Sequence, residues 1–395
     1  MTHPINVLLV PTSDYIGHPF PQRLNHIFEK VAEEATIDVH VARFQIFNDL
    51  TLQTKSKIHV LDEYKSKYVP IYYLANIIRH GNEICRIVKE NNIDLIVLSN
   101  LAPALGYLLL RKKKIPVIYD IPDYFPTSAS GYLSEVNSIL GRFLTFIFKN
   151  IFDWIIKQSD YVSVASSALY SYVDKLHKRN VRLIPNGIGN HFLTNDDDDF
   201  KEEMGFSDNI PIIGYLGSLE FWLDLEPLFK AIRSVIDSGI HLNLLMIGNS
   251  LHTDYMKSVD SLVSRYELKD YITRINFVPY ELVPKYIRTM DITLLPFSTS
   301  NPTSQYSAPN KLWEYLSQNK IVISTSIPEV MFHMDAVNIA NTNEDYEYLI
   351  TDIILSKEKY QGKVKFGYEL SKSRTWDKSS LIMIQLIRQA IEVHK

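Results

Sequence analysis

The stretch 307–325, SAPNKLWEYLSQNKIVIST, decides the fold of this chain. A short apolar strand at 292–295 precedes it. Ser307 can cap a helix whose first turn holds Pro309, where the proline ring removes no backbone hydrogen bond. The apolar run 321–324 then predicts a second buried strand. The stretch therefore predicts a strand–helix–strand unit, the repeating unit of a parallel sheet.

The start of this helix is a candidate anion site. A helix start aims free backbone N–H groups and a partial positive charge at one point. Lys311 adds a full positive charge there, and Glu314, one turn further on the same face, can accept hydrogen bonds from two hydroxyls. We therefore expect a diphosphate followed by a sugar diol at this point. The alternative is an ordinary amphipathic helix, with Leu312, Tyr315 and Leu316 in the core and Lys311 solvated.

Length and composition limit what the chain can be. At 395 residues it is too long for one ordinary core and predicts two domains. A content of 46% hydrophobic and 22% charged residues is that of a soluble globular protein, and the net charge of −4 argues against a general nucleic-acid binder. With only 14 glycines, an extended glycine-rich phosphate loop is not expected.

The N-terminus and the cysteine content suggest where the protein acts. The chain opens on a short strand at 5–10 rather than a signal peptide, and it has no run of about 18 apolar residues. The single Cys85 cannot form an internal disulfide, and no Cys cluster for zinc exists. We therefore expect a cytoplasmic protein, or one on the cytoplasmic face of a membrane.

Short apolar strands alternate with amphipathic helices, which predicts parallel sheets with helices on both faces. In the first half we expect strands at 5–10, 37–42, 93–98, 117–119, 161–164 and 182–184, with helices at 21–35, 69–91 and 105–110. In the second half we expect strands at 212–216, 242–247, 275–277, 292–295 and 321–324, with helices at 225–236, 255–266, 282–289 and from Pro309. Each half predicts a doubly wound sheet, in which ligands bind at the carboxyl ends of the strands.

A polar, acidic stretch at 190–209 separates the two halves and is interpreted as a linker or exposed loop. Its run Asp196–Asp199 is typical of a solvated loop rather than an Asp-x-Asp metal site. The expected domains are thus 1–189 and 210–370. A last segment, 371–395, carries a helix after the second sheet is complete.

Residues 309–316 resemble the Pro-x-Lys-x-x-Glu-Tyr-Leu helix of family 4-like glycosyltransferases (glycosyl transferases group 1). Further segments resemble that family in order and spacing: 184–188 (IPNGI), 213–219 (IGYLGSL), 244–248 (LLMIG), and 277–279 (FVP) followed by Tyr286, Met290 and Asp291. The resemblance implies the α/β GT-B fold, two doubly wound Rossmann-like domains that face a central cleft. It also implies that 1–189 binds the acceptor, that 210–370 binds a nucleotide sugar and that 371–395 crosses back to the first domain.

In that family the Glu holds the nucleoside ribose and the helix start faces the diphosphate. The resemblance therefore implies a donor site formed by Gly217, Ser218, Tyr306, Ser307, Asn310, Lys311 and Glu314. Relatives usually carry Arg at position 218, Lys at 223 and Glu at 306, but this chain has Ser218, Leu223 and Tyr306. Donor affinity must then depend more on the helix start and Lys311, and the loop 298–306 must recognise the sugar with different groups.

Two regions of the first domain offer candidate chemistry. Asp120 and Asp123 follow a strand, where similar enzymes often show Tyr-Asp-x-x-Asp; we favour Asp123 for the acceptor contact and as a general base, with Asp120 as its structural partner. The alternative is a pair of turn-capping residues. In the first loop, Arg23 could meet a phosphate and His18 an acceptor hydroxyl, although a lone loop histidine is more often polar surface.

The segment 139–157 predicts a long helix with one polar stripe, and apolar side chains cover the rest of it. That apolar breadth exceeds what packing on a sheet needs. Basic residues at 111–114 and 175–182 add positive charge that anionic lipid would attract. We expect peripheral membrane contact through 139–157; the alternative is a helix buried against a neighbour or a dimer partner.

These features predict a hexosyltransferase that moves a hexose from a UDP- or GDP-sugar to a hydroxyl, on a lipid-linked glycan at the membrane surface. The helix start and Lys311 would stabilise the leaving diphosphate, and the scheme requires no cofactor and no metal. Retention or inversion at the anomeric carbon stays open. A nucleotide-sugar 2-epimerase and a catalytically silent sugar-binding subunit are the alternatives. A dinucleotide-dependent oxidoreductase is disfavoured, because neither half shows Gly-x-Gly-x-x-Gly after its first strand.

Overall fold

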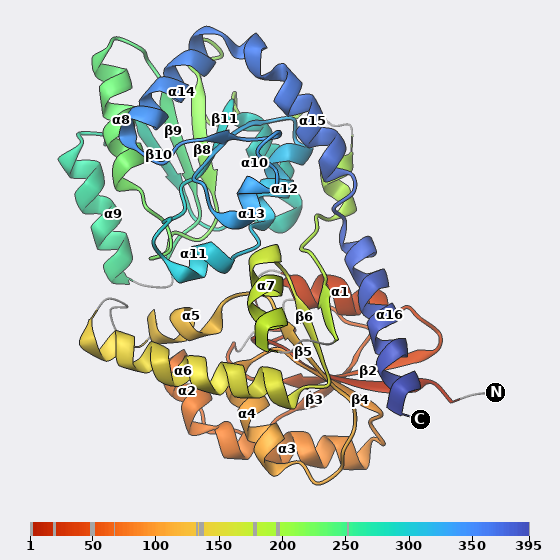
Figure 1. Ribbon diagram of the computed structural model, residues 1–395. Coiled ribbons are helices and arrows are strands. Elements are labelled where there is room, and N and C mark those ends of the chain that lie inside the picture. The colour runs from red at the N-terminus through yellow and green to blue at the C-terminus, as the bar shows by residue number, and fades with distance from the viewer. Residues whose placement is uncertain are drawn as a thin grey trace. The chain divides into compact units, whose positions relative to one another are not determined.

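The computed structural model describes residues 3–18, 21–47, 52–66, 68–131, 133, 138–176, 180–194, 198–250 and 253–394. The chain divides into two compact units, each an α/β structure around one parallel sheet (Figure 1). The first unit comprises Met1–Asn186, Tyr306–Ala308 and Trp376–Lys395. The second comprises Gly187–Gln305 and Pro309–Thr375. The predicted α/β class with two doubly wound sheets is confirmed.

The first unit contains a seven-stranded sheet in the order β3-β2-β1-β4-β5-β6-β7, and all its pairings are parallel. Its strands are β1 Ile5–Val10, β2 Ile37–Arg43, β3 Lys57–Val60, β4 Leu95–Leu98, β5 Val117–Ile121, β6 Tyr161–Val164 and β7 Val181–Leu183. The sequence did not predict β3, because its residues KIHV alternate at a partly exposed sheet edge and form no apolar run.

Helices cover both faces of this sheet. Along β1, Val7 and Leu9 join a core with α1 (Arg23–Val31) and α16 (Trp376–His394), because side chains alternate between the faces of a strand. Leu8 and Val10 join the other core (Figure 1). The helices of this second face are α2 Val69–Ala75, α3 Ile77–Glu90, α4 Leu101–Leu110, α6 Ile139–Gln158 and α7 Ser167–Leu176; a short α5 spans Phe125–Gly131.

The expected single helix at 69–91 is wrong, since α2 and α3 are separate helices that meet at Asn76. The Asn76 side chain donates to the carbonyls of Tyr64 and Tyr72 and accepts from the Tyr64 N–H. Asparagine competes with helical hydrogen bonding in this way, so the chain turns where the apolar periodicity continues.

The second unit contains a six-stranded parallel sheet in the order β10-β9-β8-β11-β12-β13. Its strands are β8 Ile212–Leu216, β9 Asn243–Ile247, β10 Ile272–Ile275, β11 Ile292–Leu295, β12 Ile321–Ser324 and β13 Asn338–Ile339. Its helices are α8 Glu226–Asp237, α9 Thr253–Arg265, α10 Val283–Thr289, α11 Pro302–Tyr306, α12 Asn310–Ser317, α13 Pro328–Met331, α14 Asn343–Leu355 and α15 Gln361–Ser371. Strand order reverses between β8 and β11, and this switch point is where doubly wound sheets bind ligands.

The stretch 190–209 is not simply an exposed loop. A 3₁₀ turn, Asn190–Leu193, places Phe192 in the core of the second unit, and the Phe200 N–H donates to Thr289 Oγ1. Of the acidic run, Asp196 and Asp197 lie outside the described residues, and Asp198 pairs with Lys285 at 3.0 Å. The stretch therefore belongs to the packing of the second unit.

The last helix, α16, packs against α1 in the first unit, although it follows the second sheet in sequence. Trp376 at its start stacks on His26 with ring centroids 4.8 Å apart. Met383 and Ile387 lie in the same core as α1. Among the residues that the structure describes, no helix combines the length and the apolar character needed to cross a membrane.

Close packing of α3 on α4 generates a first prediction. A Cβ on Gly106 would lie 1.9 Å from the Ile77 carbonyl oxygen, so Gly106→Ala should lower the free energy of unfolding by about 1–3 kcal/mol or more. Gly362 in α15 has open space around its Cα, and Gly362→Ala should change stability by less than about 1 kcal/mol. Urea unfolding of both variants checks this; equal stability of the two would contradict the close helix contact.

Candidate functional site

The carboxyl end of β8 brings Gly217 and Lys311 together, as the sequence predicted. Gly217 has φ of +147°, and its N–H donates to the Ile247 carbonyl at 2.7 Å. A Cβ on Gly217 would lie 1.6 Å from Lys311 Cε and 2.5 Å from Lys311 Nζ. The lysine side chain therefore lies directly against the glycine backbone at the switch point, and a side chain at position 217 would displace it; the φ of +147° also favours glycine there.

Helix α12 begins at Asn310, one residue after Pro309, and no side chain caps its first turn. The N-cap position is held by Pro309, whose backbone is extended at φ −68° and ψ 112°, and not by Ser307. Asn310 Oδ1 is buried at this helix start and has no hydrogen-bond partner among the described residues.

Glu314 lies one turn after Lys311 on α12 and is only 7% exposed. Burial raises the pKa of its carboxyl above the ordinary value of 4.5, and the charge of Lys311 acts in the opposite direction. A carboxylate in this position can accept hydrogen bonds from a ligand that replaces the water it has lost. The burial of Glu314 is therefore compatible with a carboxylate that accepts hydrogen bonds from a bound ligand.

Tyr315 fixes α12 to β8, which the sequence analysis missed because it placed Tyr315 only in the core. Its phenol oxygen accepts from the Leu216 N–H at 2.8 Å, and the side chain is fully buried. Burial raises the pKa of this phenol well above its ordinary range, so it stays a neutral donor and acceptor. The sequence did contain a signal for this contact, because the hydroxyl of a tyrosine placed in the core needs a hydrogen-bond partner.

Ser218 comes directly after Gly217 in the sequence, and its carbonyl accepts a hydrogen bond from the Tyr215 hydroxyl at 2.7 Å. The loop 298–306, which was expected to recognise the sugar, is hydrogen-bonded to the main chain of Trp222. The Trp222 carbonyl accepts from the Ser298 N–H and from Ser304 Oγ. Asn301 donates to the Phe221 carbonyl. The backbone of this loop is thus anchored to the segment after β8.

In the first unit, Asp120 makes buried contacts with residues of neighbouring elements. Its side chain is fully buried and forms an ion pair with Arg23 at 3.2 Å. Ser163 Oγ donates to the same carboxylate at 2.7 Å. Arg23 also donates to Asn186 Oδ1 at 2.7 Å and to the Ile184 carbonyl at 2.8 Å. These partners use most of the guanidinium N–H groups, and the contact of Arg23 with a phosphate stays a prediction.

Asp123 is exposed two residues after the end of β5. Its carbonyl accepts from the Phe125 N–H at 3.0 Å, which shapes the turn into α5. Of the two predicted carboxylates, Asp123 is therefore the one that a substrate can reach.

Tyr306, which was predicted to bind the donor, packs in an aromatic cluster of the first unit. Its ring stacks on Tyr124 with centroids 4.7 Å apart and meets the Tyr172 ring edge at 5.6 Å. Its carbonyl accepts from Ser166 Oγ, and the nearby Ala308 carbonyl accepts from Asn186 Nδ2. The tyrosine serves packing where relatives use an acid for the sugar.

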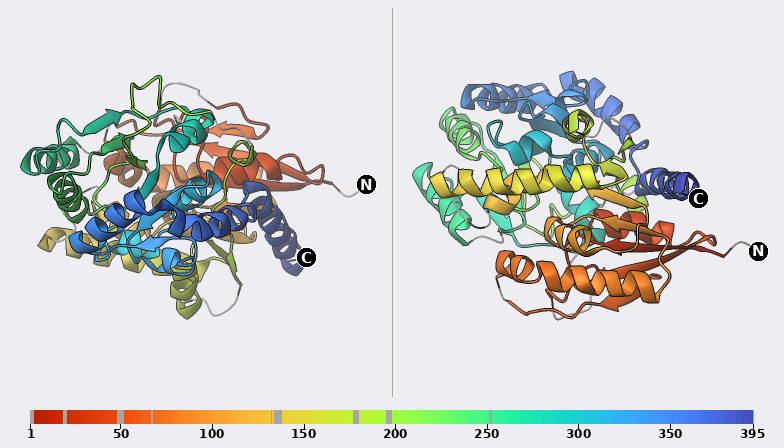
Figure 2. Two further views of the ribbon diagram at one scale, coloured as in Figure 1. Left: turned by 90° about the horizontal axis from the view of Figure 1, so that it is seen from above. Right: turned by 60° about the horizontal axis from the view of Figure 1, so that its bottom comes forward.

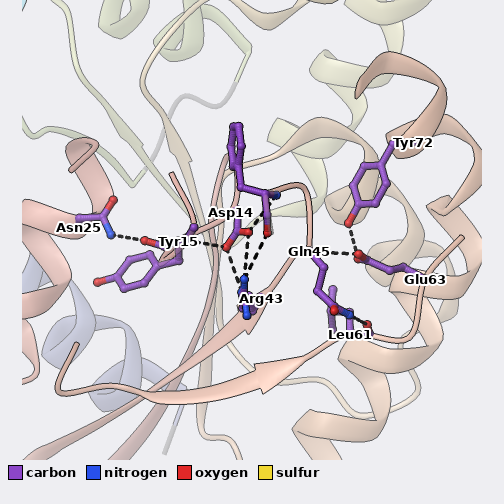
Figure 3. A network of polar contacts seen from close by, with 10 residues as sticks. Asp14, Tyr15, Asn25, Arg43, Gln45, Leu61, Glu63 and Tyr72 are labelled. Carbon is purple, nitrogen blue, oxygen red and sulfur yellow. Dashed lines mark hydrogen bonds and ion pairs between the residues drawn. The ribbon is translucent and has the colours of Figure 1, made fainter. Parts of the chain in front are cut away.

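His18 ends the described part of the first loop. Its Nε2 lies 3.0 Å from Gln22 Nε2, and its ring meets Phe47 edge-on. Asp14 holds this loop by accepting from Gly17 N–H and from Arg43 Nε at 3.0 and 3.1 Å (Figure 3). The loop at the carboxyl end of β1 is thus ordered by a buried acid, and the role of His18 toward an acceptor stays a prediction.

Two family models match the chain: Glycosyltransferase Family 4 over residues 32–189, and Glycosyl transferases group 1 over residues 210–354. Together they cover about three quarters of its length, one in each unit.

The chain belongs to the family 4-like glycosyltransferases.

A relative in this glycosyltransferase family is TuaH of Bacillus subtilis, named for teichuronic acid biosynthesis, which is 26% identical over 216 residues. That match covers 54% of this chain and 51% of TuaH, so the chain matches about half the length of this relative.

Solved structures share the GT-B fold. Sucrose-phosphate synthase of Thermosynechococcus elongatus superimposes with a TM-score of 0.81 at 17% identity, over 98% of this chain and 100% of that one. Anabaena HepE in complex with UDP-glucose gives 0.72 at 14% identity, over 98% and 99%. At these identities the likeness shows the fold alone, which confirms the predicted GT-B architecture.

The buried carboxyl of Glu314 generates a second prediction. Its folded-state pKa lies above 4.5, so the charged form lowers stability at pH values above that raised pKa, and the loss disappears as the pH falls toward 4.5. Glu314→Gln should therefore stabilise the ligand-free protein by about 0.5–2 kcal/mol at pH 8 and by less at pH 5. Thermal unfolding at both pH values checks this against exposed Glu202→Gln, which should show no such difference; a destabilised Glu314→Gln protein would contradict it.

Proposed function

We propose that this chain transfers a hexose from a UDP-sugar to a hydroxyl group of an acceptor. The observation that carries the proposal is the contact of Lys311 with Gly217 at the switch point, with Glu314 one turn further along α12. These groups present a cation, the start of a helix and a carboxylate in the order that a diphosphate followed by a ribose requires.

The diphosphate would lie at the start of α12. Lys311 and the backbone N–H groups of the first turn would stabilise the negative charge that develops on the leaving nucleotide. The Asn310 amide lies buried at the same point, and its oxygen and nitrogen are interchangeable by a flip, so it can present an N–H to a phosphate oxygen. Glu314 would accept from the ribose hydroxyls.

We favour UDP over GDP because HepE, which shares the fold over nearly its whole length, is described with UDP-glucose. The acceptor is proposed to be a lipid-linked glycan. The name of TuaH, which refers to teichuronic acid biosynthesis, supports a role in glycan assembly. Apolar side chains of α6 that face solvent support an acceptor at a membrane surface. In this scheme the chain's own residues act without a metal or other cofactor.

Asp123 would act on the acceptor. It is the exposed carboxylate at the carboxyl end of β5, and it can orient the acceptor hydroxyl and take its proton as the glycosidic bond forms. Asp120 would contribute only by holding this edge of the sheet in place through Arg23 and Ser163.

Substitution of Lys311 tests the donor site. Lys311→Ala should weaken UDP binding by about 10- to 150-fold, since a hydrogen bond to a charged group contributes about 1.5–3 kcal/mol, and it should abolish turnover of UDP-glucose. Exposed Lys269→Ala in the same unit is the matched control. Thermal shift with UDP and with GDP, together with release of UDP, provides the measurements.

Several outcomes would overturn the proposal. A larger thermal shift with GDP than with UDP would show that the donor nucleotide is GDP. Unchanged UDP binding in Lys311→Ala would show that the donor site does not include Lys311. Conversion of UDP-N-acetylglucosamine to its 2-epimer without an acceptor would assign the chain to the epimerases. Binding without any turnover would leave a sugar-binding subunit.

Substitution of Asp123 separates acceptor chemistry from donor binding. Asp123→Asn should lower transfer by about 10²–10⁴-fold, the usual contribution of a general base, and leave the UDP-induced thermal shift unchanged. Asp174→Asn, an exposed acid on α7, should leave both unchanged. Transfer at the wild-type rate in Asp123→Asn would exclude this carboxylate from catalysis.

A further inference from the structure

Helix α6 of the first unit exposes apolar side chains where a surface helix normally carries polar ones. Ile139 is 83% exposed, Phe146 65%, Phe143 58% and Leu140 57%. These residues recur at intervals of three and four, so they form one stripe along the N-terminal half of the helix. The opposite stripe, with Phe148, Phe152 and Ile155, is buried in the core.

The polar residues of α6 are largely used inside the unit. Thr145 Oγ1 bonds with Ser130 Oγ at 2.7 Å. Asp153 forms an ion pair with Lys149 and accepts from the Tyr172 hydroxyl. The polar stripe that the sequence showed therefore contacts protein in part, and the exposed side chains of the first three turns are apolar except for Arg142.

Neighbouring helices extend this surface. Helix α6 packs on α4, which packs on α3 and α2, and all four cover the same face of the first sheet. Both Figure 1 and the right-hand view of Figure 2 show α2 on the side of the N-terminal half of α6. Ile71 and Leu74 of α2 are 50% and 45% exposed. The sequence predicted only 139–157 as a membrane-contacting segment, because the seven residues of α2 are too few to show an apolar periodicity.

Basic residues predominate in three segments of this surface. Segments 64–82, 101–119 and 138–152 contain three, four and two Lys or Arg residues and no Asp or Glu, although the whole chain has a net charge of −4. Arg111 donates to the Gln158 carbonyl, which places the exposed run Lys112–Lys114 beside the C-terminal end of α6. The surface that carries the apolar stripe is therefore mainly basic, and the one acid of α6, Asp153, is paired with Lys149.

We propose that this surface, made of α2, the end of α4 and α6, docks on an anionic lipid bilayer. Apolar side chains of α6 and α2 insert at the headgroup boundary, and Arg142 and Lys112–Lys114 contact the lipid phosphates. A second copy of the chain fits less well, because a two-fold interface would place the same basic residues against each other. The docking itself does not depend on the proposed function. Its purpose does, since at the bilayer the first unit would meet a lipid-linked acceptor.

The test uses the full chain with vesicles of phosphatidylglycerol and phosphatidylcholine, and with vesicles of phosphatidylcholine alone. Flotation should show binding to the anionic vesicles at least ten times tighter than to the neutral ones, and 0.5 M NaCl should weaken it. Phe143→Ser combined with Phe146→Ser should weaken binding at least tenfold. Phe332→Ser combined with Tyr348→Ser removes two aromatic side chains that are each 67% exposed in the second unit, and it should change nothing.

Lys112→Gln, Lys113→Gln and Lys114→Gln combined should remove most of the preference for anionic vesicles. Failure of the wild-type chain to bind anionic vesicles overturns the proposal, as does equal weakening by the control variant. A dimer in light scattering that the Phe143 and Phe146 variant abolishes would instead assign the surface to a second copy. The UDP-induced thermal shift is measured on the same samples: its absence contradicts the donor site but not the docking surface, and its presence in the double variant shows that the variant folds.

Discussion

Steric room at Gly217 is the constraint on which the candidate donor site depends. The β8 strand ends there, Lys311 crosses the place where a Cβ would stand, and Tyr315 ties α12 to the same strand end through the Leu216 N–H. A Cβ on Gly248 would come within 2.1 Å of the Gly217 carbonyl, so the end of β9 approaches just as closely. The Lys311 side chain therefore lies against the Gly217 backbone, and the backbones of Gly217 and Gly248 pack directly on each other.

A buried ion pair has the corresponding role in the first unit. Asp120 on β5 is fully buried and Arg23 on α1 is nearly so, and a buried pair of this kind is stable only when its remaining hydrogen-bonding groups are satisfied. Ser163 of β6 and the carbonyl of Ile184 supply that satisfaction. This hydrogen-bond network therefore connects the carboxyl ends of β5 and β6, and Asp123 lies just beyond the end of β5.

Much of this architecture follows from local sequence. Apolar runs such as 212–216 and 321–324 predict buried strands, and the spacing from Lys311 to Glu314 predicts one helix face, because both depend on residues near one another in the chain. Arg23 and Asp120 lie 97 positions apart, so their pairing could not be deduced, and a free arginine in a loop was the simpler expectation. Asn76 and Pro309 shifted helix boundaries through hydrogen bonds and steric effects that periodicity does not report. Tyr306 could not be placed either, since its partners, Tyr124 and Tyr172, come from a distant segment.

The departures from the family pattern suggest how the donor site divides its work. In the proposed donor site, the positions of Ser218 and Leu223 offer no base, so the phosphate charge would fall to Lys311 and the start of α12, which carry no information about the sugar. The buried carboxyl of Glu314 would discriminate more sharply, because a ligand without ribose hydroxyls would leave a desolvated acid unpaired. Recognition of the sugar then remains for 298–305, whose backbone is anchored on Phe221 and Trp222. In the proposed site, that arrangement would let side chains of the loop vary while the nucleotide keeps one position.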